Sequence, residues 1–406
     1  MKTEFFMGTI QEPQFPDLEI MAGNYLSIQE AINACAKAGG GTVIVGEGQW
    51  ETGPIRLYSN ICLYFKAGAI VTFSSKKSDY LPVVFTRWEG TECYNYSPLI
   101  YANDCENIAI CGEGELFGNG EFWWGWKKLQ QAGSNILYDA AVAGLPVEQH
   151  VFGSEESALR PSFLQMIHCR RVLIEGITLN DGPQWTIHPV YCENVVIRNV
   201  HVRTTGPNTD GLNPDSCKNV VIEDSDFCAG DDCVAINSGL NEDGWRIGRA
   251  CENIEIRRCR MTGGHGGVVV GSAISGGVRN VYVHDCTITA TMQGLRMKSM
   301  RGRGGVVENI HFENIKIEDV SHEALQINMF YEFSTVMPKT KEPSIFRNIR
   351  FVNIWGKGAK VGLMLKGLPE RKLENILLRN VELTAQEAMV CSDVSGLVMD
   401  QVTFCS

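Results

Sequence analysis

The stretch NVVIRNVHVRT, residues 194–204, holds two short runs of alternating apolar residues separated by an Arg-Asn bend. Alternation with a period of two predicts β-strands and not a helix. Related phrases begin at Asn107, Asn219, Asn253, Asn280, Asn309, Asn348 and Asn375. From Asn194 to Asn375 the steps are 25, 34, 27, 29, 39 and 27 residues, which is a period typical of solenoid proteins.

A unit of about 25 residues with two or three short strands matches one coil of a β-helix, whereas a propeller blade needs four strands and about 40 residues. Asparagine tolerates the left-handed conformation of a turn, and stacked copies can form a hydrogen-bonded ladder. Five cysteines precede the asparagine position by two residues, which favours a stacked thiol row over a metal site: Cys105, Cys169, Cys192, Cys217 and Cys251. We therefore predict an all-β chain, with one parallel β-helix of roughly ten coils as a single domain over residues 1–406.

The N-terminal segment, residues 1–41, contains a predicted helix over residues 27–38. Ser27 and Glu30 have the spacing of a capping box, and three glycines at 39–41 end the helix. Because the end of a solenoid must be covered, we expect this helix to cap the N-terminal end of the β-helix.

Two aromatic-rich stretches interrupt the repeat, at residues 80–98 and 121–163. Long insertions in a solenoid usually lie on one face, often the binding face. We predict that both are inserted loops flanking a groove, and that most of their aromatic side chains pack onto the coils.

The charge balance restricts the partners of the chain. Lys and Arg number 36 against 47 Asp and Glu, a net charge of −11, which argues against nucleic acid or an anionic membrane surface. No apolar run approaches the roughly 18 residues that span a bilayer. The first residues show no signal-peptide pattern, and the 15 cysteines are an odd number, so we expect reduced thiols and a cytoplasmic location.

Polar groups gather on successive coils of the predicted solenoid. The motifs are NTDG at 208–211, GDD at 230–232, GHG at 264–266, Arg-Met-Lys at 296–298, and Tyr331. Neighbouring coils lie about 4.8 Å apart, so residues at equivalent positions stack into one patch. The sequence thus predicts a groove holding three carboxylates, an imidazole, two cations and a phenol.

This combination of groups indicates hydrolysis of a glycoside. Three close carboxylates cannot all ionise readily, so at least one pKa should rise. A protonated acid beside ionised carboxylates is what glycoside hydrolysis requires, and the neighbouring cations suit a substrate with its own carboxylate. Each motif alone has a structural explanation, such as a turn or a solvated strand. Their coincidence on successive coils favours a site.

In this order on a β-helix, NTDG, GDD, GHG and Arg-x-Lys resemble family 28 of the glycoside hydrolases, the polygalacturonases. The resemblance covers nearly the whole chain, including SIQEAINAC and RWEGTECYNYSPLI. It implies a right-handed β-helix that hydrolyses α-1,4-galacturonosidic bonds with inversion and without metal or cofactor. Asp231 resembles the general acid, with Asp210 and Asp232 holding the attacking water.

The resemblance extends to the residues around the carboxylates. His265 is similar to the residue that tunes or reprotonates the acid, and Asn208 to a supporting polar residue. Arg296 and Lys298 resemble a clamp on the galacturonate carboxylate, and Tyr331 resembles the sugar-binding tyrosine. Because protein and substrate are both acidic, binding must depend on placed cations, to which Arg301 and Arg303 could add.

Two features point to the mode of action. Many relatives have aspartate where this chain has Asn213, a change expected to alter a binding subsite and no catalytic role. The phrases RWEGTECYNYSP and NTDGxxPDSC look closest to bacterial exo-acting members. The insertion at 121–163 could wall off one end of the groove, and one or two of the inserted aromatics are expected to stack on a sugar. We therefore expect exo release of galacturonate from oligogalacturonides or pectin.

Three alternatives stay open at this stage. The substrate could be a rhamnogalacturonan oligosaccharide with a terminal galacturonate. A β-eliminating pectate lyase shares the β-helix but would need calcium and yield an unsaturated product. From another class, the chain could be a non-catalytic pectin- or glycan-binding β-helix. A homo-oligomer is compatible with the resemblance.

Overall fold

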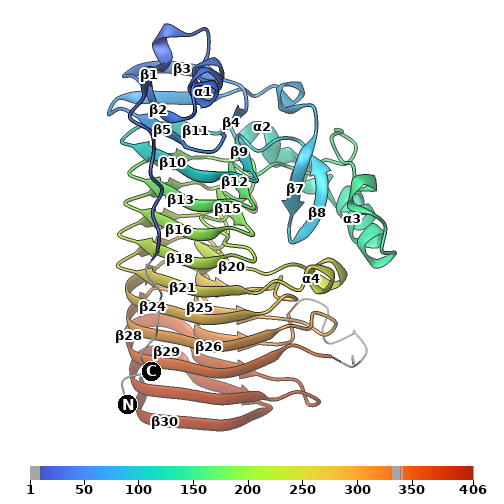
Figure 1. Cartoon of the computed structure of the whole chain (residues 1–406). Coiled ribbons are helices and arrows are strands. Elements are labelled where there is room, and N and C mark those ends of the chain that lie inside the picture. The colour runs from blue at the N-terminus through green and yellow to red at the C-terminus, as the bar shows by residue number, and fades with distance from the viewer. Residues whose placement is uncertain (1–9, 332–338, 340–341, 406) are drawn as a thin grey trace.

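The computed structural model describes residues 10–331, 339 and 342–405. The first nine residues of the predicted segment 1–41 thus lie outside the described part. Parallel strands stack one above another from the N-terminal to the C-terminal end, as in a parallel β-helix (Figure 1). The predicted fold class is confirmed.

The first sheet follows the asparagine phrases of the sequence. Its pairings run through twelve strands, slightly more than the roughly ten coils predicted, and β1 (Glu19–Met21) pairs with the outer edge of β2. The twelve are β2 (Gly41–Val45), β5 (Ile61–Phe65), β10 (Glu106–Gly112), β13 (Arg170–Glu175), β16 (Glu193–Arg198), β18 (Lys218–Glu223), β21 (Cys251–Arg257), β24 (Val278–Thr289), β26 (Val306–Glu318), β28 (Ile345–Lys366), β29 (Leu373–Ser392) and β30 (Val394–Cys405).

Each strand of the second sheet begins after the bend in one of the repeated phrases. Its strands are β3 (Gly48–Thr52), β6 (Ala69–Phe73), β11 (Glu115–Phe117), β14 (Thr178–Asn180), β17 (His201–Arg203), β19 (Asp226–Cys228) and β22 (Arg260–Thr262), which pairs with the second half of β24.

The third sheet carries the polar motifs. Its strands are β4 (Ile55–Arg56), β9 (Ile100–Asn103), β12 (Leu164–Ile167), β15 (Ile187–Val190), β20 (Val234–Ile236), β23 (Gly266–Val270), β25 (Gln293–Lys298) and β27 (Glu323–Asn328). Leu212 bridges Ile187 and Val234, so the coil between β15 and β20 continues the stack without a named strand of its own. Inward-facing side chains of the three sheets form one continuous apolar core.

The turn asparagines adopt the conformation that the sequence predicts. Asn107, Asn219, Asn253 and the later members have φ between 55° and 58°. Asn253 Nδ2 donates to Asn219 Oδ1 at 3.0 Å, and further links continue the ladder to Asn375. The predicted thiol row is also present, because the Cys217 thiol donates to the Pro189 carbonyl of the preceding coil at 3.2 Å, within a series of similar bonds.

The N-terminal end is capped as predicted. Helix α1 (Ile28–Lys37) follows Ser27, whose hydroxyl accepts the backbone N–H of Glu30 at 3.1 Å. The short helix η1 (Ala22–Asn24) precedes α1. Ala22 of η1 is buried, and so are four residues of α1: Ile28, Ala31, Ile32 and Cys35. Apolar burial of this face therefore closes the core at its first coil.

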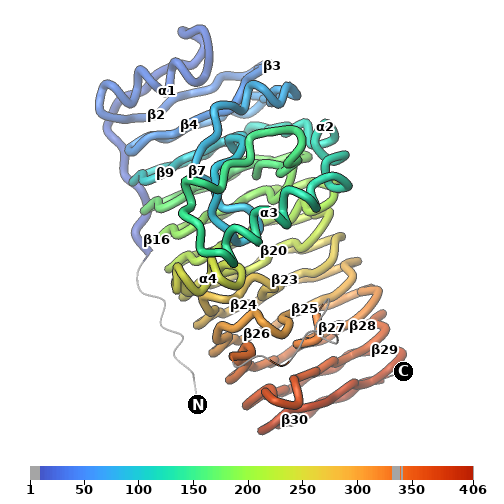
Figure 2. The backbone as a smooth tube through the Cα atoms, turned by 90° about the vertical axis from the view of Figure 1, so that its right-hand side faces the viewer, coloured from blue at the N-terminus to red at the C-terminus, as the bar shows by residue number. Residues whose placement is uncertain are grey.

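The two insertions are more regular than the loops predicted. The 3-10 helix η2 (Lys77–Tyr80) leads into the first, which contains the antiparallel hairpin of β7 (Val84–Trp88) and β8 (Thr91–Asn95). The second holds α2 (Glu121–Trp124), η3 (Gly125–Lys128), α3 (Gln131–Val142) and η4 (Val147–Gln149). Figure 2 shows α3 and β7 in front of the third sheet, beside α4 (Asn241–Ile247), which α3 contacts.

Most inserted aromatic residues pack onto the coils, as expected. Trp123 is fully buried and makes edge contacts with Tyr80, Tyr96 and Trp126. A search for strand repeats does not find the helices of the insertions, because their local periodicity is mixed. Packing against the coils stabilises these helices in addition to intrinsic helix propensity.

Candidate active site

The predicted polar residues lie along the third sheet at the predicted positions. Asp231 and Asp232 precede β20, and His265 precedes β23. Arg296 and Lys298 belong to β25, and Tyr331 follows β27. Because Val234 pairs with Val268, and Val268 with Leu295, these motifs stack on consecutive coils.

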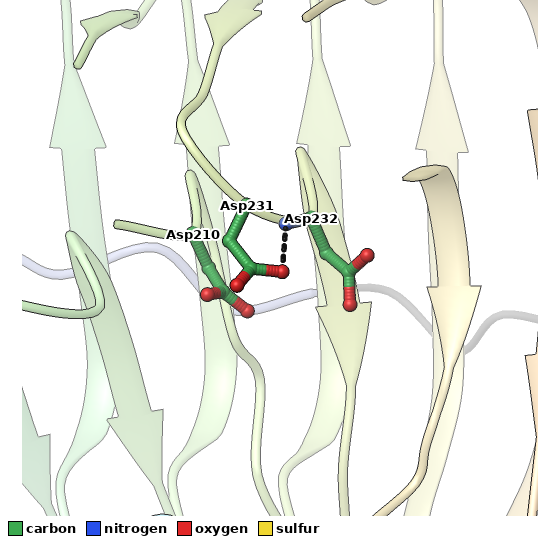
Figure 3. Close-up of side chains that lie close together, drawn as sticks. All are labelled: Asp210, Asp231 and Asp232. Carbon is green, nitrogen blue, oxygen red and sulfur yellow. Dashed lines mark hydrogen bonds between the residues drawn. The ribbon is translucent and has the colours of Figure 1, made fainter. Parts of the chain in front are cut away.

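Three carboxylates converge at the centre of this stack. One oxygen from each of Asp210, Asp231 and Asp232 lies within 4.8 Å of the other two. Figure 3 shows the three side chains pointing to the same side, with the backbone N–H of Asp232 donating to Oδ1 of Asp231 at 2.9 Å. Asp210 and Asp232 are only 5% and 2% exposed. The sequence prediction that these carboxylates meet is confirmed by this geometry.

Asp231 is held from two sides. The His265 imidazole Nδ1 lies 2.8 Å from its Oδ1, and Nδ2 of Asn208 donates to its Oδ2 at 3.4 Å. Asn208 is itself positioned by Arg160, whose Nη2 donates to the Asn208 Oδ1 at 2.7 Å. Arg160 is fully buried and was absent from the sequence prediction, because its contact with Asn208 spans 48 residues.

The pKa values of Asp210 and Asp231 are shifted in opposite directions. Burial raises the pKa of Asp210 well above its ordinary value, and the charges of Asp231 and Asp232 add to this effect. Burial also works to raise the pKa of Asp231, but the hydrogen bond and charge of His265 and the charge of Lys298 hold it below its ordinary value. The rise expected from three close carboxylates is therefore found on Asp210, and not on the residue that resembles the general acid.

The cations stand beside Asp232. The Lys298 Nζ donates to its Oδ2 at 2.8 Å, and the Arg296 Nη1 lies 4.0 Å from its Oδ1. Burial works to lower the pKa of Lys298, but the charge of Asp232 raises it above its ordinary value. The ring of Tyr331 lies 5.5 Å from the Arg296 guanidinium and 5.3 Å from the Lys298 ammonium. Both cations thus contact the carboxylate trio, a role additional to the expected substrate clamp.

Arg301 and Arg303, the two cations suggested as additions to the clamp, lie in different places. Arg303 lines the same cavity and is 5% exposed. Arg301 donates from Nε to Oε1 of Glu370 at 2.7 Å and does not line this cavity. Of the two suggested additions to the clamp, only Arg303 is therefore placed at the site.

Asn213 contacts the trio directly. Its Nδ2 donates to Oδ2 of Asp210 at 2.8 Å, and its side chain is fully buried. The expectation that this position affects only a binding subsite is therefore incomplete, because the amide touches a carboxylate of the trio.

A cavity of about 720 Å³ surrounds these groups. Arg296, Lys298 and Tyr331 line it on the side of the later coils. The inserted segments also line it, through Glu89, Lys127, Tyr138, Ala141 and Val142. Of the inserted aromatics described, Tyr138 is the one that lines the cavity, while Trp185 from the coil before β15 was not singled out in the sequence.

The trio could in principle share a cation, since its oxygen atoms converge. Within the described residues the ammonium of Lys298 already donates to one of these oxygens. No described helix is long and apolar enough to cross a membrane.

Comparison with known proteins agrees with this geometry. The family model described as Glycosyl hydrolases family 28 matches residues 150–404. The chain belongs to this family. It is a polygalacturonase-type glycoside hydrolase, and family membership removes the support for a non-catalytic glycan-binding protein.

Similar proteins in this family differ in their described mode of action. The structure of a hyperthermoactive exopolygalacturonase from Thermotoga maritima has 39% sequence identity and a TM-score of 0.93, and the alignment covers 98% of this chain and 94% of that one. A probable polygalacturonase from Vitis vinifera is 27% identical over 92% of this chain and 74% of its own length. An endo-polygalacturonase from Pectobacterium carotovorum is 26% identical over 95% of this chain and 92% of its own.

Proposed function

We propose that this family 28 hydrolase is an exo-acting galacturonosidase that releases galacturonate from the end of oligogalacturonides. The cavity around the trio carries the proposal, because the inserted hairpin and α3 line it, and Glu89 at the tip of the hairpin hydrogen-bonds to Gln184 on the earlier coil of β15. We infer that this wall stops a bound chain at its terminal sugar, so that only a chain end is accommodated. The 39% identical exopolygalacturonase agrees with an exo mode.

In the proposed mechanism His265 passes its proton to Asp231 across their 2.8 Å contact, and Asp231 protonates the glycosidic oxygen as the bond to the anomeric carbon breaks. A water molecule held by Asp210 and Asp232 attacks that carbon and gives its proton to Asp232, which accepts a hydrogen bond from Lys298. Asp232 then releases its proton to solvent, and His265 takes up a new proton from solvent. Each cycle therefore consumes one water and restores the protonation of the trio.

The cations that line the cavity favour an anionic substrate. Arg296, Lys298 and Arg303 line the cavity beyond the trio, where a galacturonate carboxylate can pair with them. Since the whole protein carries a charge of −11, these cations must supply local attraction for an anionic sugar.

Product analysis on tetragalacturonate tests the proposal. We expect galacturonate and the trimer as the first products, whereas early dimer would contradict exo action. The Asp231→Asn variant is the control, and it should release no product while binding is retained. Parallel incubation with a rhamnogalacturonan oligosaccharide distinguishes the two substrate classes.

Inversion requires its own measurement. Inverting enzymes commonly separate their two carboxyl groups by about 6.5–9.5 Å, whereas the nearest oxygens here lie within 4.8 Å. The proposed inversion therefore depends on family resemblance and not on spacing. Proton NMR during the first turnovers should show the β-anomer of galacturonate, and an α-anomer would exclude inversion.

A further inference from the structure

The tip of the inserted hairpin departs from local sequence preference. Glu89 and Gly90 form its two-residue turn, with φ of 42° and 87°. Positive φ at both positions is typical of a type I′ turn, where asparagine, aspartate or glycine is preferred first. Glutamate is disfavoured in this conformation. Such departures from local preference concentrate at functional sites.

This turn is fixed against the coils. The backbone N–H of Leu240 donates to the Gly90 carbonyl at 3.0 Å. A Cβ on Gly90 would lie 3.1 Å from Leu240 and 3.2 Å from Ala273, so the approach is close. The position of Glu89 in the cavity wall is therefore defined by tertiary contacts.

The Glu89 carboxylate is oriented by two donors. Gln184 Nε2 donates to its Oε1 at 2.8 Å, and the Tyr138 hydroxyl donates to its Oε2 at 3.3 Å. Burial raises its pKa, while the charges of Lys127 and Arg160 act in the opposite direction and Asp231 adds a repulsive contribution. A carboxylate has about four acceptor positions, so two donors leave capacity for a ligand.

We propose that Glu89 recognises the chain end by accepting a hydrogen bond from the 4-hydroxyl of the non-reducing galacturonate. This inference rests on the proposed exo function. In a 1,4-linked chain that hydroxyl is free only on the terminal sugar, so a residue that selects this end must recognise it. Glu89 lines the cavity and hydrogen-bonds to Gln184 on the coil of β15, earlier in the stack than Arg296 and Lys298 on β25. Lys127, on the same wall, suits the carboxylate of that sugar.

The variant Glu89→Asn separates recognition from folding. Asparagine favours positive φ, so the turn should keep its shape and the thermal midpoint should stay equal or rise. The shorter side chain, however, withdraws the acceptor from the cavity. Gln401→Asn is the matched control, because Gln401 also has positive φ, 53°, and lies on β30 away from the cavity.

The measurement compares trigalacturonate with the same trimer lacking the 4-hydroxyl at its non-reducing end. For wild type and Gln401→Asn, kcat/KM should fall by about 10- to 100-fold with the deoxy trimer, as expected for a hydrogen bond to a charged group. For Glu89→Asn the ratio should shrink to about threefold or less. A ratio retained in Glu89→Asn, or absent in wild type, would overturn the inference.

Calorimetric binding of both trimers in the Asp231→Asn background gives the same ratio without turnover. The ratio of the two dissociation constants should be smaller when Glu89→Asn is also present. An equal ratio in the two proteins overturns the inference. If wild type hydrolyses neither trimer, the proposed function fails, while this binding ratio still decides the role of Glu89.

Discussion

The imidazole Nδ1 of His265 lies 2.8 Å from Oδ1 of Asp231, and the two residues occupy equivalent positions on adjacent coils. Their hydrogen bond raises the pKa of His265 above its ordinary value, against the effect of burial. The same contact helps to hold the pKa of Asp231 below its ordinary value. The pair therefore holds one proton beside the Asp231 carboxylate up to a higher pH than a histidine of ordinary pKa would.

The pair predicts the alkaline limit of activity. In the proposed mechanism protonated His265 supplies Asp231, so kcat/KM should fall as pH rises through the pKa of His265, above its ordinary value of 6.5. The stabilising contribution of this contact has the same sign, because it is complete below 6.5 and is lost as pH rises through the folded-state pKa. In His265→Gln we expect kcat to drop by about 100-fold and the alkaline limb to change position. A pH–rate profile that matches wild type would exclude this role.

Lys298 should contribute to both binding and turnover. Lys298→Ala removes a possible partner of the substrate carboxylate and the donor to Asp232. We expect KM to rise by about 10- to 100-fold and kcat to fall as well, since a charge-assisted hydrogen bond is lost in each case. Steady-state kinetics on trigalacturonate give both constants. Lys218→Ala, at an exposed ion pair with Glu252, is the control, and an unchanged KM for Lys298→Ala would remove Lys298 from the clamp.

Asn213→Asp tests the amide contact with Asp210. The substitution replaces a donor 2.8 Å from Asp210 with a fourth carboxyl in a fully buried position. Repulsion and burial should raise the pKa of the new carboxyl, so its destabilising effect grows as pH rises. We expect a thermal midpoint lower than wild type at pH 8 that recovers at pH 5, and an activity optimum at lower pH. A midpoint difference independent of pH would show that the added charge is tolerated.

Chelation separates hydrolysis from elimination. The trio is already compensated by Lys298 and His265, and the proposed acid–base steps use no metal ion. After treatment with EDTA we expect kcat/KM within about twofold of the untreated enzyme, with reducing ends formed and no ultraviolet absorbance from an unsaturated product. Loss of activity that calcium restores would instead favour a lyase.

The repeat and the active-site motifs could be predicted from the sequence because both depend on short-range order. Asn219 and Asn253 each start a coil, and their positive φ and side-chain ladder follow from local turn chemistry. Once the coils stack, Asp231 and His265 must meet, since equivalent positions lie one strand spacing apart. The repeat therefore places residues at equivalent positions of successive coils next to one another.

The surroundings of the trio depend on long-range contacts that no repeat in the sequence reveals. Glu89 reaches the cavity from an inserted hairpin, and Arg160 reaches Asn208 across 48 residues, so no repeat relates them. The raised pKa of Asp210 depends on burial and on several neighbouring charges together, which sequence order does not provide. The stack and its row of polar side chains follow from the repeat in the sequence, while the cavity wall and the proton distribution depend on long-range packing, because burial and insertion geometry have no local period.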